Sequence, residues 1–218
     1  MAEYGPQTGR DVGPAVVVVG RQFSIRNAVN FTVTRTASLF SPNDRYKVMD
    51  INDDVVFKGK GFFDLRGPCE TAPTPNHFRR CRHAVFSWHQ TWRVFRGEST
   101  SPNDLLFSVR KPQIFQWKDN CDVILATNAA DQAVASPCAF KIISRCTTCT
   151  ICIGESDEII AQMDRKTAFL ARDKLEVTVN PNVDYVFILS LIIVLEEIKA
   201  SRRRSNAASV RRRRRRAT

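Results

Sequence analysis

The sequence lacks an apolar run long enough to cross a membrane as a helix. Its longest one, residues 185–195, has eleven positions and is interrupted only by Ser190. Eleven helical residues span about 16 Å, whereas the hydrocarbon core of a bilayer is about 30 Å thick. Asp184 precedes the run, and Glu196 and Glu197 follow it. We therefore expect no transmembrane segment, but a helix that a protein core surrounds on every side.

The common motifs of catalysis are also absent. The sequence has no G-x-S-x-G nucleophile turn, no H-E-x-x-H zinc-binding helix and no glycine-rich loop of the kind that holds phosphates. The stretch MAEYGPQTGRDVGP at the start has neither the basic segment nor the apolar run of a secretory signal. We expect a non-enzymatic protein without a cofactor, located in the cytoplasm, whose seven cysteines stay reduced.

Two patterns begin like metal sites but do not complete one. Cys146, Cys149 and Cys152 have the spacing of zinc or iron–sulfur ligands, but no fourth ligand stands at a suitable distance. Their stretch is rich in Thr and Ile, as in a strand, which would point Cys149 away from the other two. Residues 50–54 begin like a calcium loop, but Val55 stands where that loop needs glycine. We predict no metal site.

Short strand-like runs make up most of the remaining sequence. In them β-branched or aromatic residues alternate with polar ones, and turn residues separate the runs. The expected strands are residues 31–36, 46–50, 55–60, 92–96, 105–109, 113–117, 122–127, 139–144, 147–153, 159–163 and 174–179, with 16–23 as a further candidate. Residues 66–84 contain three prolines and no clear period, so we expect a loop there.

A buried helix in a chain of strands predicts a closed barrel. Eight strands leave an interior only wide enough for side chains, so a helix about 10 Å across needs roughly eleven or twelve. The number of expected strands agrees with this requirement. The predicted fold class is mainly β, a closed antiparallel barrel of about 12 strands around the buried hydrophobic C-terminal helix.

Positive charge gathers at the end of the chain. The net charge is +11, but residues 199–218 hold ten basic residues and no acidic one, which leaves 23 basic against 22 acidic residues elsewhere. We predict an N-terminal extension over residues 1–20, a barrel over 21–198 and a disordered tail over 199–218. The arginines of the tail are Arg202, Arg203, Arg204, Arg211, Arg212, Arg213, Arg214, Arg215 and Arg216.

The tail leaves three interpretations open. Its two clusters have the spacing of a bipartite nuclear import signal. A polybasic segment also binds RNA or anionic lipid by releasing counterions. The third interpretation is a solvated tail without a dedicated partner.

Several stretches resemble the plant LURP-one-related family. They are residues 105–111 (LLFSVRK), 149–151 (CTI), 154–156 (GES), 160–167 (IAQMDRKT) and 177–185 (VTVNPNVDY), and the last of these leads into the apolar helix. Residues 92–97 and the expected strands 31–36 and 46–50 fit as well. The match covers roughly residues 21–198. Residues 66–84 depart from the family pattern, which has a further hairpin there, and the Arg-rich tail is additional.

The resemblance implies a tubby-like barrel related to phospholipid scramblases, and a binding module without catalytic residues. It implies binding of phosphoinositides or of a protein partner, and a link to plant defence. Basic residues at strand ends are the candidate lipid head-group site: Arg110, Lys111, Arg165 and Lys166.

The expected partners are therefore anionic phospholipid head groups at a membrane surface or a protein, with nucleic acid only through the tail. Besides the cytoplasm, the expected locations are the plasma membrane surface and the nucleus. The alternative function is a nuclear regulatory protein whose tail serves import or nucleic-acid binding.

Overall fold

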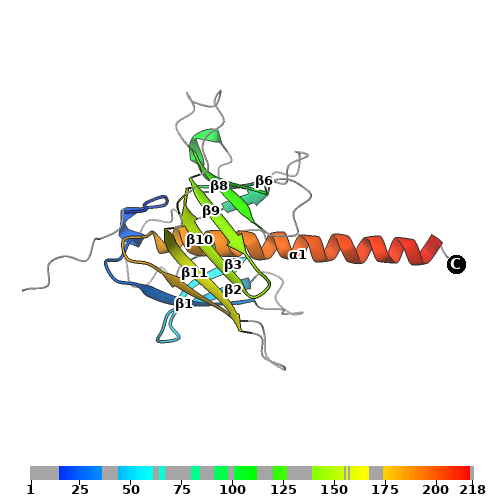
Figure 1. Ribbon diagram of the computed structural model, residues 1–218, viewed down its shortest axis with the longest axis horizontal. Helices are drawn as coiled ribbons and strands as arrows, with labels where there is room; N and C mark the ends of the chain where they lie inside the picture. Colours follow the sequence, from blue (N-terminus) through cyan, green and yellow to red (C-terminus); the bar gives the residue numbers. More distant parts are fainter. Residues whose placement is uncertain are drawn as a thin grey trace, which may run out of the picture.

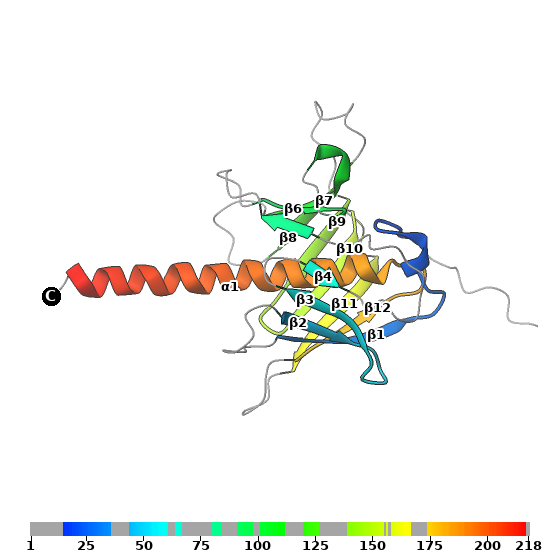
Figure 2. The same ribbon diagram turned by 180° about the vertical axis from the view of Figure 1, so that it is seen from behind.

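In the part of the chain that the structure describes, twelve strands form one antiparallel sheet, and a long helix packs against it (Figures 1 and 2). The computed structural model describes residues 15–35, 44–60, 64–66, 80–83, 91–97, 101–111, 120–126, 139–154, 156, 158–166 and 174–216. The strands are β1 (Val29–Arg35), β2 (Asp44–Met49), β3 (Val55–Lys60), β4 (Asp64–Arg66), β5 (Arg80–His83), β6 (Thr91–Phe95), β7 (Leu105–Arg110), β8 (Cys121–Leu125), β9 (Phe140–Ser144), β10 (Thr148–Ile153), β11 (Ile159–Lys166) and β12 (Lys174–Val179). The helix α1 comprises Tyr185–Arg216, and two 3-10 turns are η1 (Arg21–Phe23) and η2 (Pro102–Asp104).

The sheet is a meander in which the first and the last strand along the chain pair with each other. Its strand order is β4-β3-β2-β1-β12-β11-β10-β9-β8-β7-β6-β5, so β1 pairs with β12 in the middle of the sheet. Both views show strands on opposite sides of α1 (Figures 1 and 2). The mainly β fold with one C-terminal helix is thus confirmed. The described residues of the edge strands β4 and β5 form no ladder with each other, so the closure of the barrel stays a prediction.

The core lies between the inner face of the sheet and the first half of α1. Alternate residues of β12 are buried, as expected for a strand with one face on the core. On the helix, Phe187 is fully buried and packs edge-on against Phe107 with ring centroids 5.1 Å apart, and against Phe140 at 5.0 Å. Burying such a side chain contributes about 1.5–3 kcal/mol. Burial continues through Ala200, which confirms the predicted core helix and extends it.

Asp184 caps the start of the helix and connects it by hydrogen bonds to the first described residues of the chain. Its Oδ1 accepts a hydrogen bond from the backbone N–H of Phe187 at 3.0 Å, as an N-cap does. Its Oδ2 accepts from the N–H groups of Val19 at 2.7 Å and Gly20 at 3.0 Å. Asn182 lies in the preceding turn with a φ of 61°.

Four further expectations concern single segments of the chain. Residues 16–23 do not form a strand, because Val16 makes only an isolated bridge to Val183 and η1 follows. Residues 66–84 are not loop throughout, since β5 lies within them and pairs with β6. The expected strand 113–117 lies outside the described residues. Helix α1 continues through Arg216, past residue 199, where the tail was expected to begin.

The continuous helix has a simple cause in the sequence. No glycine or proline occurs after Pro181, so no residue that commonly ends a helix is present, and arginine and alanine favour helix. Within the part of the chain that the structure describes, no helix has the length and apolarity needed to cross a membrane.

Candidate anion-binding surface

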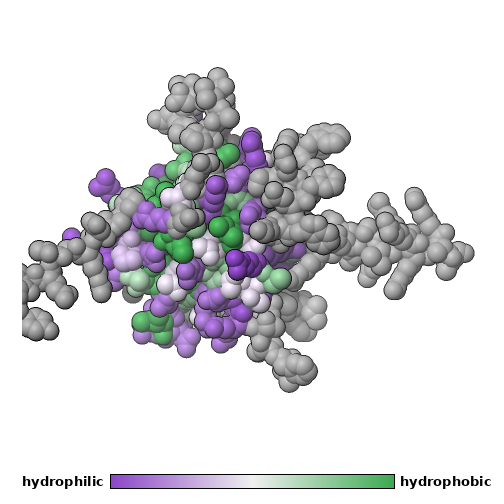
Figure 3. Space-filling view, in the orientation of Figure 1, coloured by the Kyte–Doolittle hydropathy of each residue, from purple (hydrophilic) through white to green (hydrophobic). Residues whose placement is uncertain are grey.

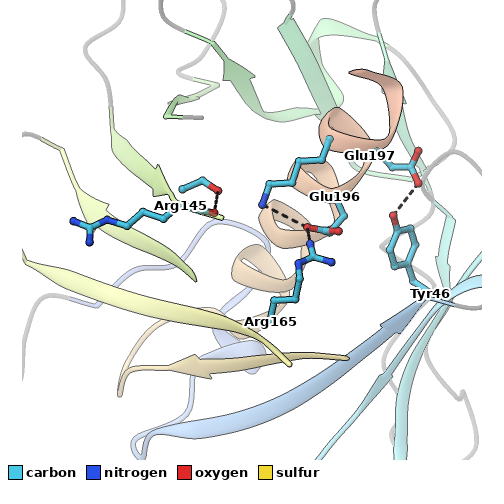
Figure 4. A network of polar contacts seen from close by, with 7 residues as sticks. Tyr46, Arg145, Arg165, Glu196 and Glu197 are labelled. Atoms are coloured by element: carbon cyan, nitrogen blue, oxygen red, sulfur yellow. Dashed lines mark hydrogen bonds and ion pairs between the residues drawn. The ribbon is translucent and has the colours of Figure 1, made fainter. Parts of the chain in front are cut away.

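Two adjacent glutamates tie α1 to the sheet where the helix leaves it (Figure 4). Glu196 Oε1 lies 2.5 Å from Arg165 Nη2 and 3.7 Å from Lys199 Nζ. The hydroxyl of Tyr46 donates a hydrogen bond of 2.8 Å to Glu197 Oε1. Both glutamates are buried, with 7% and 3% of their surface exposed. These contacts join β2, β11 and the helix at one end of the core.

Burial controls the ionisation of Tyr46 and of Cys149. It raises the pKa of the Tyr46 hydroxyl far above its ordinary value, and the charge of Glu197 raises that pKa further. Burial also raises the pKa of the Cys149 thiol to about 12, against a partial opposing effect of Lys199. Both groups therefore keep their protons near neutral pH, and Tyr46 is a stable hydrogen-bond donor to Glu197.

The four residues predicted to bind a lipid head group are not brought together. Arg110 pairs across the sheet with Asp122, and the same row continues through Lys141 and Cys152 to Ile159, the first residue of β11. Arg165 and Lys166 are the last two residues of that strand. Arg110 and Lys111 therefore lie at the opposite end of the strands from Arg165 and Lys166.

Arg165 and Lys166 also face opposite sides of the sheet. The Arg165 side chain is only 10% exposed and faces inward to Glu196, so its charge is already paired. The Lys166 side chain is 60% exposed and lies 3.5 Å from Glu176. Of these two, Lys166 alone is positioned to meet a ligand at the outer surface.

A row of basic residues crosses the outer face of the sheet at the level of Lys166. Lys166 on β11 stands opposite Lys174 on β12, and Lys174 stands opposite Thr34 on β1. The register then continues from Thr34 to Lys47 on β2 and to Lys58 on β3. We call Lys166, Lys174, Lys47 and Lys58 the basic row.

Register places the members of the basic row on the outer face. Residues directly opposite each other in a ladder share a face, and the neighbours Arg165, Leu175 and Tyr46 are turned inward. Neighbouring strands are about 4.8 Å apart, so the row from β11 to β3 is about 19 Å long. Lys166, Lys174 and Lys58 are exposed, and Lys47 is half-buried.

The charges of the row are poorly balanced by the protein itself. Among the described residues, ion pairs engage Lys166 but none of Lys47, Lys58 and Lys174. Like charges that face each other across a ladder destabilise the sheet. Lys166 faces Lys174, and Lys47 faces Lys58, so an anion bound along the row would relieve this repulsion.

The sequence alone did not reveal this row because its members come from four separate strands. Their only signal is a basic residue at an outward position near a strand end, and only the register shows that these positions align. The row also lies at the end of the fold where α1 emerges. Lys47 follows Tyr46 and Lys166 follows Arg165, the two residues that contact the glutamates of the helix.

The outer face of β9, β10 and β11 carries a shallow groove of about 370 Å³. Apolar and polar residues are mixed over this face (Figure 3). The side chain of Arg145 extends away from Glu196 (Figure 4). The lining residues are Ile143, Arg145, Thr148, Thr150, Cys152 and Ile159. Cys152 therefore lies on the outer face, whereas Cys149 belongs to the inner core and Cys146 is exposed in the turn before β10.

Residues 50–54, which begin like a calcium loop, form a hairpin turn between β2 and β3. Asp50 Oδ1 accepts hydrogen bonds from the backbone N–H groups of Asn52 at 2.8 Å and Asp54 at 2.9 Å. One carboxylate oxygen is thus used within the turn, as in an Asx-turn.

Comparison with known proteins points to one family. The sequence model described as LURP-one-related matches residues 29–196. The chain is 38% identical over 208 residues to Protein LURP-one-related 1 of Arabidopsis thaliana, covering 90% of this chain and 89% of that protein. It is 33% identical over 194 residues to Protein LURP-one-related 15 of the same plant, covering 84% and 85%. A solved X-ray structure of an Arabidopsis thaliana protein matches with a TM-score of 0.59 and 28% identity, covering 84% of this chain and 98% of that one.

Proposed function

The chain belongs to the LURP-one-related family, and we propose that it is a non-enzymatic module that binds phosphoinositide head groups at a membrane surface. In this proposal the curved sheet is a closed, tubby-like barrel whose outer face meets the lipid. The protein works in the cytoplasm, at the inner surface of the plasma membrane, and takes part in plant defence.

The basic row is the observation that supports lipid binding. Phosphoinositide head groups present several phosphates, and an array of lysines along about 19 Å contacts more than one of them as separate point charges. A lysine near an anionic membrane surface contributes about 1 kcal/mol. Lys47, Lys58, Lys166 and Lys174 therefore replace Arg110, Lys111 and Arg165 as the head-group residues that we favour.

Co-sedimentation with liposomes tests the proposal. The protein should be a chain that ends at Ala200, so that the arginines of the tail do not contribute. We expect it to pellet with vesicles that contain phosphoinositide, and the triple variant Lys47→Gln/Lys58→Gln/Lys174→Gln to bind at least tenfold more weakly. The matched control Arg110→Gln/Lys141→Gln removes basic residues from the far end of the strands and should bind normally.

Equal binding by the two variants would rule out the row as the lipid site. If the truncated chain showed no preference for phosphoinositide over neutral vesicles, lipid binding by the barrel would be wrong. A protein partner would then be the remaining function for this surface.

A second candidate function is nuclear regulation. It is favoured by the tail, in which Arg202–Arg204 and Arg211–Arg216 lie beyond the family match and form two clusters. A fluorescent fusion that lacks residues 201–218 tests the import role. Nuclear signal should decrease in this fusion, and an unchanged distribution would remove the tail as an import signal.

A further inference from the structure

The last part of α1 forms a charged helical arm that leaves the sheet without a break. We define the arm as residues 201–216, which follow the buried Ala200 and are helical to Arg216. Both ribbon views show this segment extending away from the strands (Figures 1 and 2). Sixteen helical residues are about 24 Å long.

The fold holds the base of the arm in place. Glu196 and Glu197, one turn before it, contact Arg165 and Tyr46 on two different strands. Helix nucleation is the costly step in forming a helix, and here the buried half of α1 has already completed it. The arm therefore lengthens a helix that is already formed, whereas a free peptide of this sequence would have to nucleate its own helix.

Arginine residues are distributed around the helical backbone of the arm. The arm contains nine arginines and no acidic residue, and Arg211–Arg216 are consecutive. Six consecutive helical residues make more than one and a half turns, so their Cα positions fall on every side of the helix. Arginines three and four positions apart repel each other, although the negative end of the helix dipole offsets part of this repulsion. A partner that neutralises the arm must carry negative charge on more than one side of it.

The arm does not have the sequence of a helix that lies in a membrane interface. Such a helix needs a broad apolar face with Trp, Phe or Leu. The arm has Val210 and two alanines as its only apolar residues. A flat anionic surface would also neutralise only the side of the helix that faces it.

Double-stranded DNA can place negative charge on more than one side of a helix, and it does not require an apolar face on that helix. Its major groove, about 12 Å wide, admits an α-helix and is bordered by a phosphate strand on each side. We propose that the arm binds duplex DNA in this way, through phosphates and without selecting bases. The proposal gives the second candidate function its partner, and it does not depend on lipid binding by the barrel.

Fluorescence anisotropy of the full chain with a labelled duplex of mixed sequence tests the proposal. If six to nine phosphates are neutralised, the logarithm of the affinity should fall with the logarithm of salt with a slope of about −5 to −8. Replacing Arg211–Arg216 with glutamine keeps residues that favour helix, and should weaken binding at least a hundredfold and reduce the slope. The control Arg110→Gln/Lys141→Gln should bind as the unaltered chain does.

A second variant separates a helical arm from a flexible polycation. Ala208→Pro keeps every charge but interrupts the helix before Arg211. We expect at least tenfold weaker binding. The thermal unfolding midpoint should stay that of the full chain, because the arm extends away from the strands (Figures 1 and 2). Equal affinity for the proline variant would overturn the helical arm.

Vesicles rich in phosphatidylserine provide the remaining comparison. If the full chain pellets with these vesicles but gives no anisotropy change with DNA, the proposal is overturned in favour of a membrane role for the arm. Failure of the truncated chain to bind phosphoinositide, with DNA binding intact in the full chain, would contradict only the proposed function of the barrel.

Discussion

The hydroxyl of Tyr46 donates a hydrogen bond to Glu197 Oε1 at 2.8 Å inside the fold, and so joins β2 to the last buried turn of α1. The two residues are 151 positions apart in the sequence. The bond helps to hold the helix at the point where it leaves the sheet, and so does the ion pair of Arg165 with Glu196. The position of the helix therefore depends on polar contacts at this end as well as on apolar packing.

Replacing Tyr46 with phenylalanine should destabilise the protein by about 1–3 kcal/mol, because it leaves a buried carboxylate without its hydroxyl donor. The free energy of unfolding in urea measures the change. A double-mutant cycle with Glu197→Gln gives the coupling of the two side chains, which we expect to be at least 0.5 kcal/mol. Additive effects of the two substitutions would contradict a direct interaction.

Arg165→Gln and Lys166→Gln should have opposite consequences, although the residues are neighbours. Loss of Arg165 removes one partner of a buried ion pair, and should cost about 3 kcal/mol of stability with little change in phosphoinositide binding by the folded protein. Loss of Lys166 should change stability by less than about 1 kcal/mol, because its pair with Glu176 is exposed, and should weaken vesicle binding. Urea unfolding and co-sedimentation of both variants would test this difference, and matching effects would contradict it.

The parts of the fold that depend on local sequence could be predicted. Residues 185–195 are apolar on every side and too short for a membrane, which indicated a core helix. The alternation of apolar and polar residues in Lys174–Val179 indicated a strand with one buried face, and burial there alternates as expected. In both cases a single segment carries the whole signal.

Features that depend on pairing could not be predicted in this way. Glu196 and Glu197 look like the end of the buried segment until their partners Arg165 and Tyr46 are known. The basic row likewise requires the register of four ladders, because Lys47 and Lys174 are distant in the sequence and are separated in the sheet only by Thr34. The lipid site predicted from strand ends combined both ends of the sheet, because the sequence alone does not say which strand ends adjoin.

Stability should fall at alkaline pH because of Tyr46 and Cys149. Both groups have a pKa in the folded protein above the value in the unfolded chain, and that of Cys149 is about 12. Their contribution is therefore complete below the unfolded values, about 8.5 for Cys and 10 for Tyr, and is lost as pH rises through and beyond them. The free energy of unfolding, measured from pH 8 to pH 11, should decrease less steeply in Cys149→Ala than in the unaltered chain. Identical slopes would show that the native thiol titrates as in the unfolded chain.

Leu191→Asp should prevent folding, whereas removal of the arm should not. Leu191 is fully buried in the middle of the core helix, and an unpaired carboxylate there costs several kcal/mol, which is comparable with the stability of a whole domain. We expect the variant to lack the cooperative thermal transition seen by circular dichroism. The chain ending at Ala200 keeps all the helical residues that the structure describes as buried, and should unfold with the midpoint of the full chain. A cooperative transition in Leu191→Asp would contradict the position of residue 191 in the core.

Asp184→Asn should loosen the contact between the helix start and residues 18–20. The carboxylate accepts backbone hydrogen bonds from Val18, Val19 and Gly20 through Oδ2 and from Phe187 through Oδ1, whereas an asparagine offers one oxygen and a competing NH₂ group. Asparagine is itself a good N-cap, so the helix should persist, and the loss of about 1–2 kcal/mol should fall on the N-terminal segment. Hydrogen exchange should therefore accelerate at the amides of Val19 and Gly20 more than at that of Ile188. Uniform acceleration across all three amides would mean that Asp184 stabilises the fold as a whole and does not specifically hold this segment.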